Sequence, residues 1–91
     1  MTDVDKTLDE RGKRYGRFRD HAEISQHLKA TIENYAVKRN CDLDPDQSEA
    51  LGMICHKIAR ILNGDPNYAD SWIDIAGYAK LVADRLEGLA R

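Results

Sequence analysis

The sequence has little of what marks disulfide-rich, β-rich or membrane-spanning proteins. Its two cysteines are too few for a disulfide framework, and their spacing does not match a zinc motif. No apolar run approaches the ~20 residues that cross a bilayer, and no segment alternates apolar and polar residues as a strand does. The net charge of −2 gives no general attraction to nucleic acid or to membranes. With an acidic rather than apolar N-terminus, these absences predict a cytoplasmic, all-α protein with no membrane partner and no nucleic-acid partner.

What the chain does have is apolar residues at helical spacing. The main helices are expected over 20–39, 45–63 and 69–87. The polar N-terminal segment 1–19 is at most a short and marginal helix. The sequence therefore predicts one domain over 1–91, a small three- to four-helix bundle in which the last two helices form an antiparallel hairpin. Because a core of this size is small, dimerisation would stabilise it, and we expect a homodimer.

Local signals mark the helix ends. Asp44, Pro45 and Gln47 form the clearest helix start, with a capping aspartate, a proline at the first helical position and a box-closing glutamine. Asp20 is the expected N-cap of the helix over 20–39. Gly64 is expected to end the next helix in the left-handed conformation.

The apolar stripes predict the core. Trp72 is expected to seal it near the turn of the hairpin, as large aromatic residues at helix starts usually do. Small residues on the last helix would allow close helix approach. The stripe of the helix over 45–63 consists of Leu51, Ile54, Cys55, Ile58, Ile61 and Leu62.

Opposite charges flank the turn of the hairpin and are the first candidate site. His56, Lys57 and Arg60 end one helix, and Asp70 and Asp74 begin the next. A short connection makes the two helices antiparallel neighbours, so these charges are expected to lie close together. In one interpretation the two cations pair with the two acids and fix the register of the hairpin.

In the other interpretation the acids bind a divalent cation such as Mg²⁺, and the basic side chains face the phosphates of a nucleotide. Magnesium suits a few carboxylates together with substrate phosphates. Glu23 is an alternative oxygen donor. The expected metal ligands are Asp70, Asp74, His56 and Glu49.

A second candidate site is the basic segment 11–19, which holds five cations among nine residues. Tyr15 and Phe18 lie among them, and their rings are suited to stacking on bases while cations hold phosphates. The alternative is a solvated turn whose aromatic side chains pack on the bundle. The residues expected to bind a nucleotide are Lys57, Arg60, Arg17 and Arg19.

Several motifs carry a resemblance. The segment 56–60 (HKIAR), followed by 70–79 (DSWIDIAGYA), resembles an uncharacterised family of small phage and prophage proteins. The segments 15–18 (YGRF) and 21–24 (HAEI) add to the match, which extends over residues 8–86. The same pattern is similar to phage nucleotide-modification-associated domains and, more distantly, to the all-α MazG-like nucleoside triphosphate pyrophosphohydrolases.

The MazG-like resemblance implies a Glu-x-x-Glu on one helix and a Glu-x-x-Asp on the next, which together bind magnesium. Asp74 matches the last acid, whereas Ser71 stands at the first position of that motif and residues 53–56 (MICH) replace the upstream one. The resemblance therefore implies a degenerate or non-enzymatic MazG-like domain with a nucleotide or metal site. An active Mg²⁺-dependent nucleotide pyrophosphohydrolase and a small protein-interaction module are the alternatives.

Overall fold

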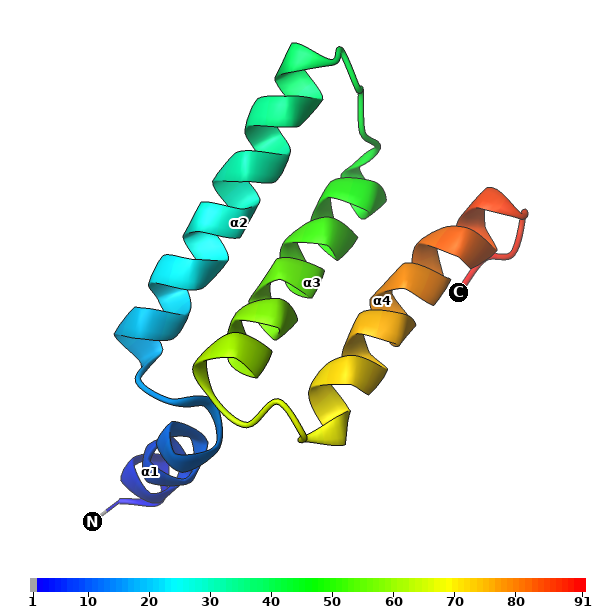
Figure 1. The fold of residues 1–91 in the computed structure, drawn as a ribbon. Coiled ribbons are helices and arrows are strands. Elements are labelled where there is room, and N and C mark those ends of the chain that lie inside the picture. The colour runs from blue at the N-terminus through cyan, green and yellow to red at the C-terminus, as the bar shows by residue number, and fades with distance from the viewer. Residues whose placement is uncertain (1) are drawn as a thin grey trace.

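The computed structural model describes residues 2–91, and residue 1 of the expected domain lies outside that range. The described residues form four α-helices and no strand, which confirms the all-α bundle with a C-terminal hairpin (Figure 1). The helices are α1 (Asp3–Tyr15), α2 (Phe18–Lys38), α3 (Pro45–Asn63) and α4 (Ala69–Leu86). No helix within residues 2–91 has the length and apolar character needed to span a bilayer.

Three of the helices lie side by side in a layer, with α3 in the middle (Figure 1). Helix α3 packs against α2 on one side and against α4 on the other, whereas α2 and α4 do not pack against each other. Helix α1 lies across the end of the layer where α2 begins and α3 ends (Figure 1). The result is elongated, with extents of 47 × 30 × 25 Å.

Two turns interlock at the α1 end of the layer. The Asn63 amide Nδ2 donates to the carbonyl of Tyr15 at 2.9 Å and to that of Arg17 at 3.0 Å. The backbone N–H of Asp65 donates to the carbonyl of Arg14 at 2.9 Å. Gly64 lies so close to this backbone that a Cβ there would collide with the Arg14 carbonyl. These bonds fix the position of α1, although α1 itself has no buried residue.

The helix ends follow the local signals in part. The capping box at α3 is confirmed, because the Gln47 side chain accepts from the Asp44 N–H at 2.8 Å. The expected start of α2 at Asp20 is wrong, because the helix begins at Phe18 with Arg17 in the N-cap position. The left-handed conformation expected for Gly64 is also wrong, since its φ is −130°. At that glycine the close approach of α1, rather than a positive φ, excludes a side chain.

The buried core is much smaller than the apolar stripes predict. Its buried hydrophobic residues are Ala50, Cys55, Ala59 and Ile61. Cys55 is therefore confirmed as a core residue. Trp72, expected to seal the core, is 55% exposed and Leu62 is 67% exposed. The Trp72 indole Nε1 donates to the carbonyl of Pro66 at 2.9 Å, which fixes the ring at the turn without burying it.

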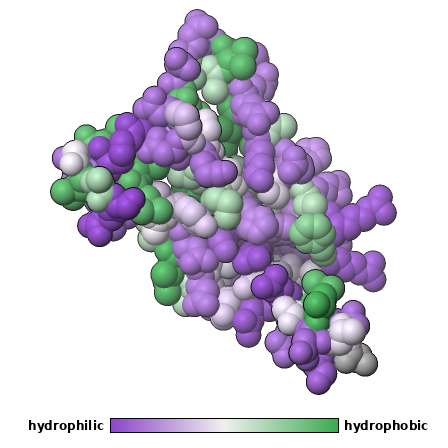
Figure 2. Space-filling view, turned by 180° about the vertical axis from the view of Figure 1, so that it is seen from behind, coloured by the Kyte–Doolittle hydropathy of each residue, from purple (hydrophilic) through white to green (hydrophobic). Residues whose placement is uncertain are grey.

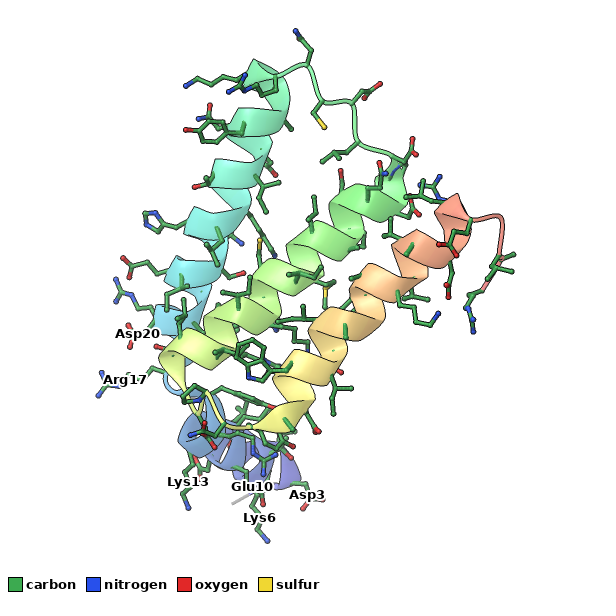
Figure 3. The ribbon with its side chains drawn as sticks, turned by 45° about the vertical axis from the view of Figure 1, so that its right-hand side comes forward. Asp3, Lys6, Glu10, Lys13, Arg17 and Asp20 are labelled. Atoms are coloured by element: carbon green, nitrogen blue, oxygen red, sulfur yellow. The ribbon has the colours of Figure 1, made fainter. Side chains whose placement is uncertain are left out.

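The side of α1 that faces away from the layer carries a stripe of alternating charges (Figure 3). Its acids and bases recur at three- and four-residue spacing, which places them on one side of a helix. This stripe is a solvated surface. The residues labelled there on α1 are Asp3, Lys6, Glu10 and Lys13.

Candidate ligand-binding site

A cavity of about 470 Å³ lies where α1, the start of α2 and the end of α3 meet. Its volume falls within the range of roughly 300–1,000 Å³ typical of small-molecule sites. The cavity wall combines arginines, histidines and aromatic rings, and it includes no carboxylate. The lining residues with side chains able to bind a ligand are Arg11, Tyr15, Arg17, Phe18, His21, His56 and Arg60.

Two histidines meet in this wall. His21 Nε2 and His56 Nδ1 are 3.1 Å apart, a hydrogen-bond distance at which one ring donates and the other accepts. The ring centroids are 4.4 Å apart and the planes are inclined by 78°. Such a bond needs one unprotonated nitrogen at the contact, so the two rings cannot both carry a positive charge without breaking it.

The surroundings keep both rings neutral. Burial, together with the electrostatic effects of His21 and Arg60, lowers the pKa of His56 to about 4. Burial also lowers the pKa of His21, with smaller contributions from Arg60 and Lys29. An anion in the cavity would reverse these effects, because an opposite charge nearby favours the protonated ring.

Two buried polar atoms, one in the histidine pair and one a helical turn further along α2, lack a hydrogen-bond partner. His21 is 4% exposed and its Nδ1 has none, and the same holds for Oγ of Ser25, which is 3% exposed. An unsatisfied buried polar group costs about 1–3 kcal/mol, so most native structures avoid it. Such groups are typical of sites whose partner is a ligand or water.

Arg60 is held in place by an aromatic ring instead of by an acid. Its guanidinium lies 4.2 Å from the centroid of the Tyr15 ring. Within residues 2–91, Arg11, Arg17 and Arg60 make no ion pair. Three arginines that make no ion pair therefore line one cavity, and guanidinium geometry suits phosphate oxygens in particular.

Aromatic surface adjoins these cations. Phe18 is 78% exposed and its ring is stacked on His21, with centroids 6.0 Å apart and an interplanar angle of 22°. Tyr15 faces Tyr68 edge-on at 6.2 Å, which stiffens this end of the molecule. An exposed ring beside unpaired cations suits a ligand that combines a flat ring with an anionic group.

In the hairpin of α3 and α4, unlike in the cavity, a cation is paired with an acid. Lys57 Nζ lies 3.0 Å from the Asp74 carboxylate, which confirms a register pair across α3 and α4. The interpretation that Arg60 also pairs with an acid of the hairpin is wrong: Arg60 stacks on Tyr15, and Asp70 accepts from the Tyr68 hydroxyl at 2.8 Å. Lys57 therefore acts inside the hairpin and does not line the cavity.

The residues expected to hold a metal do not form a shared site. His56 bonds to His21, Asp74 to Lys57, and Glu49 is exposed on α3. Across the described part of the chain, no three His, Cys, Asp or Glu side chains lie close enough together to hold a metal ion. The side chains present therefore do not fit Mg²⁺, which requires oxygen ligands in octahedral geometry.

Sequence reasoning found part of this site. It assigned Arg17 and Arg60, which line the cavity, and Arg19, which does not. It missed His21 as the partner of His56. The connection of only six residues between α2 and α3 was the available signal, because antiparallel neighbours place the start of one helix beside the end of the next.

A second hollow, of about 540 Å³, lies between the end of α2 and the start of α3. Lys29 and Glu33 both line it, so its charges balance, and the rest of its wall is mainly aliphatic. It lacks the converging cations of the first cavity and is a weaker candidate for an anionic ligand.

Comparison with protein families gives a match over most of the chain. The family model described as "Domain of unknown function (DUF6378)" matches residues 1–86. Comparison with curated proteins gave no match, and comparison with solved structures gave none.

Proposed function

We propose that this chain, which belongs to the DUF6378 family, binds a nucleotide in the cavity between α1, α2 and α3. The single observation that carries the proposal is a cavity bordered by three unpaired arginines, with a buried histidine whose Nδ1 has no partner. The guanidiniums of Arg11, Arg17 and Arg60 bind the phosphates, and the Phe18 ring offers a surface for the base.

The histidine pair couples ligand binding at this site to the uptake of a proton. When a phosphate enters, its negative charge offsets the neighbouring arginines, and one imidazole takes up a proton. The protonated ring then donates to the phosphate, and the bond between His21 and His56 keeps its single shared proton. Binding therefore strengthens as the pH falls toward the pKa that the histidine pair has in the complex.

The sequence resemblances support the same ligand class. Likeness to phage nucleotide-modification-associated domains and to MazG-like pyrophosphohydrolases favours a nucleotide over another anion. On that ground we propose a phage-type, degenerate MazG-like domain that binds without hydrolysing. The proposal also includes a homodimer, since the core of one chain is small.

The test is calorimetric titration and thermal shift with ATP, GTP, CTP and dTTP, with and without Mg²⁺. Adenosine and inorganic phosphate serve as the two separated halves of a ligand. We expect at least one nucleotide to raise the melting temperature by mass action, and each half alone to do so less. If no nucleotide shifts the melting temperature or releases heat, the proposal fails. Release of pyrophosphate in the presence of Mg²⁺ would show that the chain hydrolyses the nucleotide and would contradict a function limited to binding.

A matched pair of variants locates the site. Arg11→Gln removes a cation that lines the cavity, and we expect it to weaken nucleotide binding about tenfold, which is roughly 1.4 kcal/mol. Lys13→Gln removes a cation two residues away, on the outer side of α1 (Figure 3), and is expected to leave affinity unchanged. Equal losses in the two variants would indicate only a general effect of net charge.

A further inference from the structure

The layer of α2, α3 and α4 leaves one broad apolar side uncovered. At about 3.6 residues per turn, Leu51, Ile58 and Leu62 lie on α3 roughly opposite Arg60. On α4, a second stripe lies roughly opposite Asp74, the partner of Lys57. This stripe consists of Trp72, Ala76, Ala79, Ala83 and Leu86, all exposed. We call the two stripes together the open face.

The solvent-accessible surface area shows that the chain exposes more surface than a compact monomer of its mass. A compact monomer of 10.3 kDa exposes about 5,400 Å². This chain exposes 6972 Å², which is roughly 1,600 Å² more. Its radius of gyration of 15.3 Å likewise exceeds the ~12 Å typical of a domain this long. A standard interface covers ~800 Å² per partner, so the excess is large enough for a stable dimer.

The core leads to the same conclusion. Its four buried hydrophobic residues include two alanines and no leucine, valine or aromatic residue. The large apolar side chains lie instead at the surface, with Trp72 55%, Leu62 67% and Leu86 59% exposed. The view from behind (Figure 2) shows a surface on which hydrophilic residues predominate and hydrophobic ones are scattered. Three of these exposed apolar side chains, Leu62, Trp72 and Leu86, lie on the open face.

We infer that the open face binds the open face of a second copy of this chain. A face that meets its own copy across a twofold axis is self-complementary, and both stripes are uncharged. The alanines at 76, 79 and 83 let the backbones of two helices approach closely, and Trp72 and Leu62 fill the space beside them. The dimer thus completes the core that one layer leaves open.

The inference rests on the homodimer of the proposed function and adds its interface. It does not depend on the ligand, because Arg60 and the cavity lie on the other side of α3. Two cavities therefore face outward in the dimer, one on each copy. Nucleotide affinity is accordingly expected to be the same in the dimer and in a monomeric variant.

The test is sedimentation equilibrium of the full chain and of two glutamate variants. We expect twice the chain mass of 10.3 kDa for the native sequence. Ala79→Glu places a charge in the middle of the open face and should weaken association at least ~100-fold. Leu81→Glu is the control, since Leu81 is 49% exposed on the Asp74 side of α4 and the variant should stay dimeric.

The single tryptophan supplies a second readout. Trp72 emission should shift to longer wavelength when the native dimer is diluted until it dissociates, and should already be shifted in Ala79→Glu. Unfolding of Ala79→Glu alone would also support a covered face, because Ala79 is exposed in the single chain. A native monomer would refute both the dimer and its interface. A dimer that survives Ala79→Glu, whether or not it tolerates Leu81→Glu, would refute the interface only.

Discussion

The two sides of α3 use charge in opposite ways. On the side of α4, Lys57 is matched by Asp74 at 3.0 Å. On the side of α1 and α2, Arg60 lies over the Tyr15 ring and no carboxylate lines the cavity. The two cations are three residues apart on one helix. The cation that is paired with an acid stabilises the hairpin. The cations that line a cavity without acids are available to bind a ligand.

Asp74→Asn is expected to have the largest effect on stability of the changes that test this difference between the two sides of α3. The change leaves the nearly buried Lys57 without its carboxylate, and an uncompensated buried charge is costly. Because Asp74 is itself half-exposed, we expect a loss of about 1–3 kcal/mol in the free energy of unfolding. Urea denaturation measures it.

The double variant Lys57→Met/Asp74→Asn is the control for that experiment. It removes both partners, so most of the lost stability should return. Nucleotide affinity should stay unchanged in the single and the double variant. If either variant folds normally but loses nucleotide binding, the Lys57–Asp74 pair contributes to the ligand site, and the two sides of α3 do not have separate roles.

The pH dependence of stability is expected to be the next largest effect. The folded pKa of His56 is about 4, below its ordinary value of 6.5, so the unfolded chain binds more protons between these two values. Stability should therefore fall by about 1–2 kcal/mol as the pH drops from 6.5 toward 4. Asp46 adds little to this loss, because its hydrogen bond with Arg85 lowers its pKa, so the stability it contributes is lost mainly as the pH falls through the ordinary carboxylate value and below it.

Denaturation midpoints across this pH range test the effect. His21→Gln/His56→Gln should flatten the slope between pH 6.5 and 4, because neither side chain titrates. His27→Gln is the control, since His27 is exposed on α2 away from the pair, and it should keep the slope. A native slope that persists in the double variant would mean that the histidine pair is not the titrating group.

The smallest effect is expected from Arg17→Gln against Arg19→Gln. Arg17 lines the cavity but extends outward from the α1–α2 turn (Figure 3), so solvent screens its contribution. We expect a loss of nucleotide affinity of about threefold, or roughly 0.6 kcal/mol. Arg19 lies outside the cavity lining and should change affinity by less than the error of the titration. A larger loss of affinity in Arg19→Gln than in Arg17→Gln would indicate that the nucleotide binds on the exposed side of α2 instead.

Sequence patterns predicted the parts of the fold that depend on neighbours in the chain. The start of α3 follows from Asp44, Pro45 and Gln47 because a capping box involves only four consecutive residues. The pair of Lys57 with Asp74 follows because a short connection leaves two helices few registers. Both depend on local chemistry, which a single sequence carries.

Sequence patterns missed the features that depend on where α1 lies. Helix α1 has no buried residue, so its apolar pattern carried no information about its neighbours. The bonds from Asn63 to the Tyr15 and Arg17 carbonyls set both the place of α1 and the early start of α2. The interpretation that pairs Arg60 with an acid failed for the same reason: the Tyr15 ring reaches Arg60 only after α1 has docked.

Calorimetric titration of Arg60→Met and of Lys57→Met/Asp74→Asn tests most directly whether the two sides of α3 have separate roles. The titrant is the nucleotide that stabilises the native chain most, and circular dichroism confirms that each variant is folded. We predict at least a tenfold loss of affinity in Arg60→Met and a change of less than about twofold in the double variant. Native affinity in Arg60→Met, or a loss confined to the double variant, would contradict separate roles.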